Sequence, residues 1–326
     1  MFEEEQKTKD PKAEGTEDFC GMVEDWLQQI AGSRKYSTYI KYEKLYNCHI
    51  KEMFCGVSVP QITGHFVREK LSVSDSSDST KQAILIVINQ TLQYAEEHYG
   101  CSVVLIKNKF PRKRKPIAIL NRTEQVRLMK FLNKNMNISK AGIILCLSTG
   151  LRLGEICALK WADIDMEQML LHVNRTVQRI EIKNGATKTA LLETPPKSAF
   201  SLREIPISKT LVSMLRAFQK RGQEYVLCAD RPMEPRTYQN HFKAYLREID
   251  GGNHNFHILR HTFATNCIDN GMDVKSLSEI LGHSDVQITL NHYVHPTMDT
   301  KRKYMNALSA IYNQFCSEGK EEAQFL

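Results

Sequence analysis

The positions of apolar and polar residues predict four helices between residues 18 and 105. They are expected at Phe19–Ile30, Ser37–Cys55, Gln61–Leu71 and in a longer segment that follows Ser79. In that longer segment Ile84, Ile88 and Leu92 recur every four residues, so they lie along one face of a helix. We expect these elements to pack together as a small helical domain over residues 18–105.

Helical periodicity also dominates the sequence after residue 119. The predicted helices are Thr123–Asn133, Lys140–Ser148, Leu153–Leu159, Ser208–Arg221, Arg236–Glu248, Phe256–Asn270, Asp273–Leu281 and Asp285–Tyr293. Gly271 follows one of them at the position of a C-terminal cap. Ser284 precedes the last one at the position of an N-terminal cap.

Strand patterns interrupt these helices in the middle of the second half. Alternating residues in Thr176–Lys183 and Thr187–Thr194 flank Asn184-Gly185, a dipeptide typical of tight hairpin turns. Arg203–Ile207 is a further short strand. The predicted fold class is therefore mainly α with a small antiparallel β-sheet (α+β), with residues 119–300 as a second domain.

The composition is that of a soluble globular protein, with 42% hydrophobic and 25% charged residues. The longest apolar runs, Ala83–Ile88 and Ile143–Leu147, are too short to cross a bilayer, and no signal-peptide pattern opens the chain. The nine cysteines form no CxxC pair, which favours reduced thiols over a disulfide framework. We expect a cytoplasmic protein with no membrane partner.

The net charge of +7 is unevenly distributed along the chain. Residues 1–18 carry −4, so the other residues carry +11, and residues 1–17 have the composition of a disordered lead-in. Residues 106–118 form a basic linker, which indicates a polyanionic partner such as DNA. The candidate phosphate contacts in this linker are Lys107, Lys109, Arg112, Lys113, Arg114 and Lys115.

Several polar residues of the second domain suit chemistry on a phosphodiester. They are Arg152, Lys197, His257, Arg260, His283 and Tyr293. Arginine binds phosphoryl oxygens through paired donors, histidine moves protons, and tyrosine can form a covalent phosphodiester link. His261 lies on the same side of its helix as His257 and Arg260. The histidines lack HExxH spacing and a cysteine pair, so a metal site is disfavoured, and no phosphate-binding Walker loop is present.

These residues lie in segments that resemble the tyrosine recombinases, or lambda-type phage integrases. The matching segments are Thr149–Glu155, Leu159–Asp165, Thr194–Ser198, His257–Thr265, Leu281–Ser284 and Tyr293–His295. The residues before Tyr293, together with the Asn184-Gly185 hairpin, look most like integrases of conjugative transposons. The resemblance implies a helical core-binding domain, a tyrosine-recombinase catalytic domain and no cofactor.

The resemblance also implies a role for each candidate residue. Tyr293 would attack the scissile phosphate and form a 3′-phosphotyrosine, while Arg152 and Arg260 would bind its nonbridging oxygens. His283 would add a hydrogen bond to that phosphate, and His257 would assist proton transfer to or from Tyr293.

Lys197 would protonate the leaving 5′-oxygen. Lys188 is the alternative to Lys197, but it lacks the Pro-Pro-Lys-Ser context, and Tyr304 is the alternative nucleophile outside the motif. We expect Glu155 to have a structural role or to orient an arginine, and Trp161 to pack in the core.

The function that the resemblance implies is integration and excision of a mobile element through a Holliday junction. The expected partners are double-stranded DNA attachment sites, other copies of the chain in a tetramer, and a directionality factor, in the nucleoid-containing cytoplasm of a bacterium. The alternatives are a type IB-like topoisomerase and a catalytically idle DNA-binding regulator. Related integrases commonly carry an additional arm-binding domain, so the chain either works without arm sites or is a fragment.

Residues 301–326 are predicted to form a C-terminal helix and tail. The apolar residues of this helix are expected on one face and are Tyr304, Met305, Leu308, Ile311, Tyr312 and Phe315. Such a face must be buried, either on the same domain or, as the resemblance implies, on a neighbouring subunit.

Overall fold

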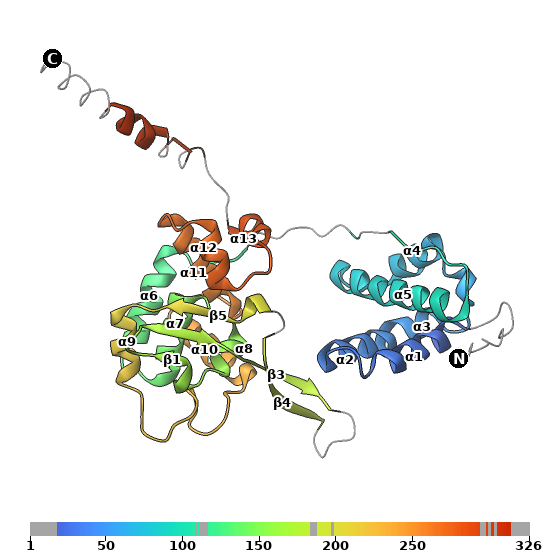
Figure 1. Ribbon diagram of the computed structural model, residues 1–326, viewed down its shortest axis with the longest axis horizontal. Helices are drawn as coiled ribbons and strands as arrows, with labels where there is room; N and C mark the ends of the chain where they lie inside the picture. The colour runs from blue at the N-terminus through green and yellow to red at the C-terminus, as the bar shows by residue number, and fades with distance from the viewer. Residues whose placement is uncertain are drawn as a thin grey trace, which may run out of the picture. The chain divides into compact units, whose positions relative to one another are not determined.

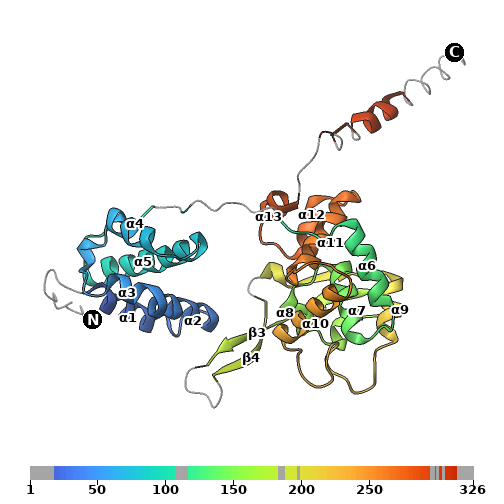
Figure 2. The same cartoon turned by 180° about the vertical axis from the view of Figure 1, so that it is seen from behind.

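The computed structural model describes residues 18–107, 110, 117–182, 188–196, 199–293, 298, 301–302 and 305–313. The chain divides into two compact units, Met1–Lys115 and Pro116–Leu326 (Figures 1 and 2). In the described ranges no helix combines the length and apolar character needed to cross a membrane. The predicted lead-in and the Asn184-Gly185 turn lie outside the described residues, and so do residues 108–109 and 111–116 of the basic linker.

The first unit is helical, and its elements surround one apolar core. Its α-helices are α1 (Phe19–Ile30), α2 (Tyr36–Leu45), α3 (Lys51–Phe54), α4 (Gly64–Val73) and α5 (Asp78–Tyr99). A π-helical turn over Tyr46–Ile50 joins α2 to α3, so the predicted helix Ser37–Cys55 is one helical stretch with an irregular middle. Tyr46 is buried at this turn and its hydroxyl donates a hydrogen bond to Glu24 Oε1 over 2.6 Å.

Side-chain caps decide where two helices of this unit begin. The Ser77 hydroxyl accepts a hydrogen bond from the backbone N–H of Thr80 and so caps α5. The helix therefore starts at Asp78, whereas the sequence predicts a start after Ser79. Helix α4 starts three residues later than predicted, because Val59–Gln61 forms a 3₁₀ turn and Thr63 caps α4. These caps satisfy backbone N–H groups that have no partner within the helix.

The second unit is mainly helical with two small antiparallel sheets, which confirms the predicted fold class. Its helices are α6 (Arg122–Asn133), α7 (Ile138–Thr149), α8 (Leu153–Cys157), α9 (Lys209–Arg216), α10 (Pro235–Glu248), α11 (His257–Asp269), α12 (Val274–Leu281) and α13 (Val286–Tyr293). Helix α9 ends five residues before the predicted Arg221. Helix α13 begins at Val286 because the Asp285 carboxylate, rather than the predicted cap Ser284, accepts the N–H of Gln287.

The three-stranded sheet of this unit contains two strands that the hydrophobic pattern did not predict. Strand β2 (Leu170–Val173) is the middle strand and pairs antiparallel with β1 (Ile164–Asp165) on one side and with β5 (Arg203–Pro206) on the other. Leu171 lies opposite Ile205, and both side chains are buried. This pairing fixes the start of β5, where Arg203 lies.

The second sheet is the predicted hairpin. Strands β3 (Thr176–Glu181) and β4 (Thr189–Thr194) pair along their whole length, from Thr176 opposite Thr194 to Glu181 opposite Thr189. The pair extends outward from the body of the unit in both views (Figures 1 and 2).

A separate apolar cluster holds the last helices together. It consists of Phe263, Ala264, Leu277, Leu281 and Tyr293, from α11, α12 and α13. Burial of each large apolar side chain contributes about 1.5–3 kcal/mol, so this cluster fixes α13 against α11. Farther along, residues 305–313 are helical, and their apolar side chains Met305, Leu308, Ile311 and Tyr312 are exposed.

Candidate active site

The site lies where the C-terminal ends of α7 and α12 meet the start of α8. Gly150 ends α7 with a φ of +66°, a conformation that residues with a Cβ rarely adopt. A Cβ at this position would also lie 2.6 Å from Phe263 Cδ1. Gly150 therefore allows the chain to turn tightly and place Arg152 at the start of α8.

Arg152 is held by a buried carboxylate and by main chain. Its Nη1 donates to Glu155 Oε1 over 2.7 Å and its Nη2 donates to the Gly282 carbonyl over 3.1 Å. One third of the Arg152 side chain stays exposed. The guanidinium is thus oriented by the protein and still accessible to a ligand.

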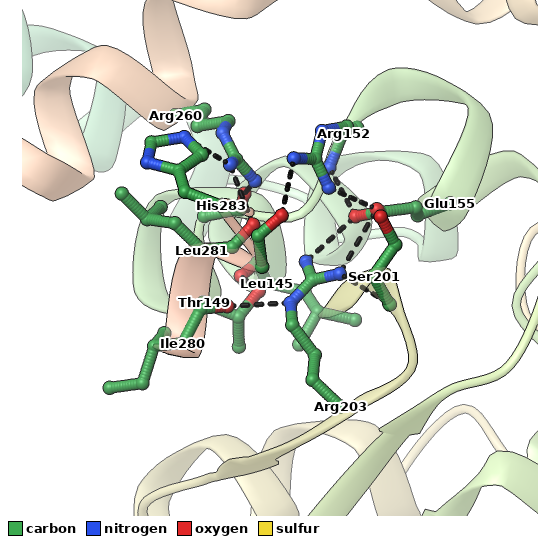
Figure 3. A network of polar contacts seen from close by, with 12 residues as sticks. Leu145, Thr149, Arg152, Glu155, Ser201, Arg203, Arg260, Ile280, Leu281 and His283 are labelled. Atoms are coloured by element: carbon green, nitrogen blue, oxygen red, sulfur yellow. Dashed lines mark hydrogen bonds and ion pairs between the residues drawn. The ribbon is translucent and has the colours of Figure 1, made fainter. Parts of the chain in front are cut away.

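Glu155 also binds a second arginine, which the sequence did not single out. Arg203 donates to both Glu155 oxygens, over 3.0 and 2.8 Å, and its Nε donates to the Ile280 carbonyl (Figure 3). Both side chains are only 5% exposed. Burial raises the pKa of the Glu155 carboxyl, but the hydrogen bonds and charge of Arg203, with the charge of Arg152, bring it down to about 2. Glu155 is therefore ionised at neutral pH and orients arginines, as its sequence context predicted.

Arg260 is the most deeply buried charged group of the site, with 2% of its surface exposed. Its Nη1 donates to the Gly150 carbonyl over 2.9 Å and its Nη2 to the Leu281 carbonyl over 2.6 Å. Burial and the charge of Arg152 lower the pKa of Arg260 to about 9, so the group is still charged at neutral pH. These two partners are neutral carbonyls, which leaves the positive charge available to an anion.

His283 lies beside Arg260 and its tautomer follows from its partners. The Arg260 guanidinium can only donate, so His283 Nε2, at 3.0 Å from Arg260 Nη2, accepts (Figure 3). His283 Nδ1 then carries the proton and donates to Thr289 Oγ1 over 2.8 Å. For His283 to donate to a phosphate from Nε2, that nitrogen must carry a proton, either because the ring is protonated or because the other tautomer forms and Thr289 Oγ1 donates to Nδ1.

Tyr293 ends α13 and is 8% exposed. Its hydroxyl lies 2.7 Å from His261 Nδ1. Burial raises the pKa of Tyr293, while the charges of Arg260 and Arg152 act in the opposite direction. The phenol is therefore neutral at rest and lies within electrostatic reach of both arginines.

His257 stands one helical turn before His261 on α11. Its ring packs edge-to-face on the His261 ring, with centroids 4.6 Å apart. The residue retains solvent access, but the surrounding protein and the charges of Arg260 and Arg152 lower the pKa of His257 to about 4. His257 is therefore neutral at physiological pH.

The structure brings together most of the predicted site residues but does not describe all of them. Arg152, His257, Arg260, His283 and Tyr293 lie on converging elements of the second unit. Lys197 lies outside the described residues, and so do the alternative nucleophile Tyr304 and the linker residues Lys109, Arg112, Lys113, Arg114 and Lys115. Lys107 and the alternative lysine Lys188 are described and exposed.

Trp161 is 5% exposed within the core, as predicted. The contacts of Arg203 and His261 were not predictable from the sequence pattern. The His261 position, directly after Arg260 on the side of the helix that carries His257, was the available signal.

Among the described residues, one group of metal-ligating atoms is compact, and it lies in the first unit. Asp18, Cys20 and Cys55 offer atoms within 4.8 Å of one another. The Asp18 carboxylate accepts the backbone N–H groups of Gly56 and Gly21, over 2.7 and 3.2 Å. Burial, with the hydrogen bond to Cys55, raises the pKa of Cys20 to about 12, which disfavours the thiolate that binds metals. Asp18 instead serves as the N-terminal cap of α1.

The fold of the chain is similar to that of solved tyrosine recombinases and integrases. The chain superimposes on the Tn1549 transposon integrase, solved in complex with transposon right-end DNA, with a TM-score of 0.76. The two are 20% identical, and the match covers 90% of this chain and 100% of that chain. The phage integrase family model matches residues 119–300, so the chain belongs to the phage integrase family.

Proteins similar to this chain include a tyrosine recombinase and a transposase. A XerC-like tyrosine recombinase of Caldanaerobacter subterraneus subsp. tengcongensis is 28% identical over 325 residues, covering 89% of this chain and 82% of the relative. The transposase of Tn916 from Enterococcus faecalis is 26% identical over 215 residues, covering 60% of this chain and 52% of the relative. The chain thus spans about half the length of the Tn916 protein and is similar to integrases of conjugative transposons.

Proposed function

We propose that this chain is a site-specific DNA recombinase that integrates and excises a mobile element through a 3′-phosphotyrosine intermediate. The observation that carries the proposal is the placement of Arg152, Arg260 and His283 around the same corner as the buried hydroxyl of Tyr293. Two guanidinium groups held in place before the substrate arrives stabilise the charge that develops on a phosphoryl group during attack.

In the proposed cleavage step, Tyr293 Oη attacks the scissile phosphorus and the bond from phosphorus to the 5′-oxygen breaks. Arg152 and Arg260 bind the nonbridging oxygens, and each such charge-assisted hydrogen bond is worth about 1.5–3 kcal/mol. His283 donates to the same phosphate and Lys197 protonates the departing 5′-oxygen. The phosphotyrosine bond keeps the energy of the broken bond, so rejoining needs no ATP and the proposal includes no cofactor.

Partners follow from this chemistry. Recombination between two duplex sites breaks four strands, and each subunit offers one Tyr293, so four copies of the chain are needed on paired attachment sites. Exposed Lys107 and the basic residues after it neutralise DNA phosphates along the linker. The helical first unit acts as the second DNA-binding domain, and a directionality factor acts during excision. In a bacterium this reaction takes place in the cytoplasm, where the nucleoid lies.

The similarity to transposon proteins supports the mobile-element role. The Tn916 relative is called a transposase, and the superimposed structure is a transposon integrase bound to transposon-end DNA. His257, which packs on His261, assists proton transfer at Tyr293.

The test uses DNA from the boundaries of the element that carries the gene, nicked so that a short 5′-strand diffuses away after cleavage. The unsubstituted chain should form a covalent protein–DNA adduct that survives denaturation. Tyr293→Phe should bind the same DNA in a gel shift and form no adduct, because only the phenolic oxygen is removed. An adduct with the phenylalanine variant would refute the assignment. A two-site recombination assay beside a plasmid relaxation assay separates recombinase from topoisomerase activity.

A further inference from the structure

We infer that His261 is the group that takes the phenolic proton from Tyr293 during cleavage and returns it during religation. The inference rests on the proposed function, and it assigns transfer of the phenolic proton to a residue outside the six candidates, one that lies within hydrogen-bond distance of the Tyr293 hydroxyl.

The contact between His261 and Tyr293 has the geometry of a strong hydrogen bond. His261 Nδ1 and Tyr293 Oη are 2.7 Å apart, within the range for proton transfer by a general base. The two ring centroids are 5.7 Å apart. Proton transfer between these atoms needs no rearrangement.

The surrounding core keeps the two side chains in this position. His261 lies on α11 directly before a run of buried residues that includes Phe263 and Ala264, and Tyr293 packs in the same apolar cluster. Both partners are thereby held by helices whose contacts do not depend on the hydrogen bond itself. A base held by a rigid core loses little entropy when it acts.

His257 supports this role from one turn away. Its ring packs nearly perpendicular to the His261 ring, at 88°. This contact orients the His261 ring and therefore its Nδ1 atom. Because its pKa is lowered to about 4, His257 adds no positive charge next to His261 at neutral pH.

The proposed step balances in atoms and charge. In cleavage the Oη–phosphorus bond forms, the bond from phosphorus to the 5′-oxygen breaks, and the phenolic proton passes to Nδ1 to give an imidazolium. The 5′-oxygen takes its proton from the general acid. In religation the 5′-hydroxyl attacks phosphorus, the Oη–phosphorus bond breaks, and the imidazolium returns its proton to the phenolic oxygen.

Two substitutions separate proton transfer from positioning. His261→Ala removes the ring, whereas His261→Asn keeps an amide group near the place of Nδ1 that can hydrogen-bond the phenol but cannot take a proton. Cleavage of the nicked substrate should slow by about 10²-fold or more in both variants, with DNA binding unchanged. The matched control is His241→Asn on α10, the same chemical change outside the site, which should cleave within about twofold of the unsubstituted chain.

The outcomes distinguish the inference from the function on which it rests. If the unsubstituted chain forms no adduct, the proposed function fails and the inference with it. If the unsubstituted chain cleaves and His261→Asn cleaves equally fast, the inference alone is overturned, because a hydrogen bond without proton transfer then suffices.

A second measurement tests the return of the proton. A DNA strand that ends in a 3′-p-nitrophenyl phosphate mimics the phosphotyrosine, but its leaving group departs without a proton. In a Tyr293→Phe background, adding His261→Asn should leave ligation of this activated strand unchanged, although the same substitution slows religation of the natural phosphotyrosine. A slowing of about 10²-fold on the activated strand would overturn the inference, since the histidine would then act on something other than the phenolic proton.

Discussion

Replacing Glu155 by glutamine should lower the free energy of unfolding of the second unit by about 3 kcal/mol at pH 7. The pKa of the Glu155 carboxyl falls from an ordinary value of 4.5 to about 2 in the folded chain. A shift of that size corresponds to roughly 3 kcal/mol of stability, at about 1.4 kcal/mol per pKa unit. Glutamine removes this contribution and leaves the 5% exposed guanidinium of Arg203 without its anionic partner.

The stabilising contribution of Glu155 depends on pH in a definite direction. Because folding lowers the pKa of Glu155, its contribution is complete above about pH 4.5 and is lost as the pH falls towards 2. The difference in free energy of unfolding between the unsubstituted chain and Glu155→Gln should therefore be nearly constant from pH 7 to pH 5. By pH 3.5 it should have narrowed by about 1.4 kcal/mol.

The assay is urea unfolding followed by tryptophan fluorescence. The chain has two tryptophans, Trp26 in the first unit and Trp161 in the second, so a Trp26→Phe background makes Trp161 the reporter of the second unit. Trp161 is 5% exposed and gains solvent on unfolding. The matched control is Glu224→Gln, whose pair with Lys160 is on the surface with Glu224 53% exposed, and it should change stability by less than about 1 kcal/mol. A Glu155→Gln effect below about 1 kcal/mol at pH 7, or one that does not narrow at pH 3.5, would refute the reasoning.

The other predictions concern Lys197, the basic linker and the C-terminal segment. Lys197→Ala should slow cleavage of an ordinary phosphodiester, and a 5′-bridging phosphorothiolate should restore the rate, because a thiolate leaves without a proton; equal defects on both substrates would remove Lys197 from the acid role. Neutralising Arg112, Lys113 and Arg114 should reduce the slope of log affinity against log salt by up to about three, and an unchanged slope would mean that the linker only connects. Deleting residues 303–326 should leave binding of one copy to DNA intact, weaken cooperative assembly on paired sites and change the cleavage rate, as gel shift and ultracentrifugation can measure. Cooperative assembly equal to that of the full chain would show that this segment does not dock on a neighbouring subunit.

The hydrophobic pattern predicted helices well where one face is buried over several turns. Helix α1 has the predicted bounds Phe19–Ile30, and its buried residues recur with helical spacing. Strands β1 and β2 were not predicted, because strands of two and four residues contain too few alternating positions to show a period. The π-helical turn at Tyr46–Ile50 was not predicted, because it changes the backbone hydrogen bonding locally and leaves the pattern of apolar side chains unchanged.

The site was predictable as a set of residue types in a family's order, but the contacts between those residues were not. Arg203 binds Glu155 across 48 positions of sequence, and nothing near Arg203 in the chain points to this partner. The bond between His261 and Tyr293 spans 32 positions and depends on how α13 packs against α11. Local patterns report which face of an element is buried, whereas the partner of a polar group depends on tertiary packing.

The carbonyl groups that hold the two arginines have a practical consequence for choosing an inactive protein. Arg152 and Arg260 donate to Gly150, Leu281 and Gly282, which lie at the C-terminal ends of α7 and α12. The guanidinium groups thus act as C-terminal caps, placing positive charge at the negative ends of two helix dipoles. Replacing either arginine leaves buried carbonyls unpaired, at a cost of about 1–3 kcal/mol, and loosens the corner of the fold on which α8 begins. Tyr293→Phe removes an oxygen and keeps both caps, so it is the better variant for trapping the assembled protein on DNA.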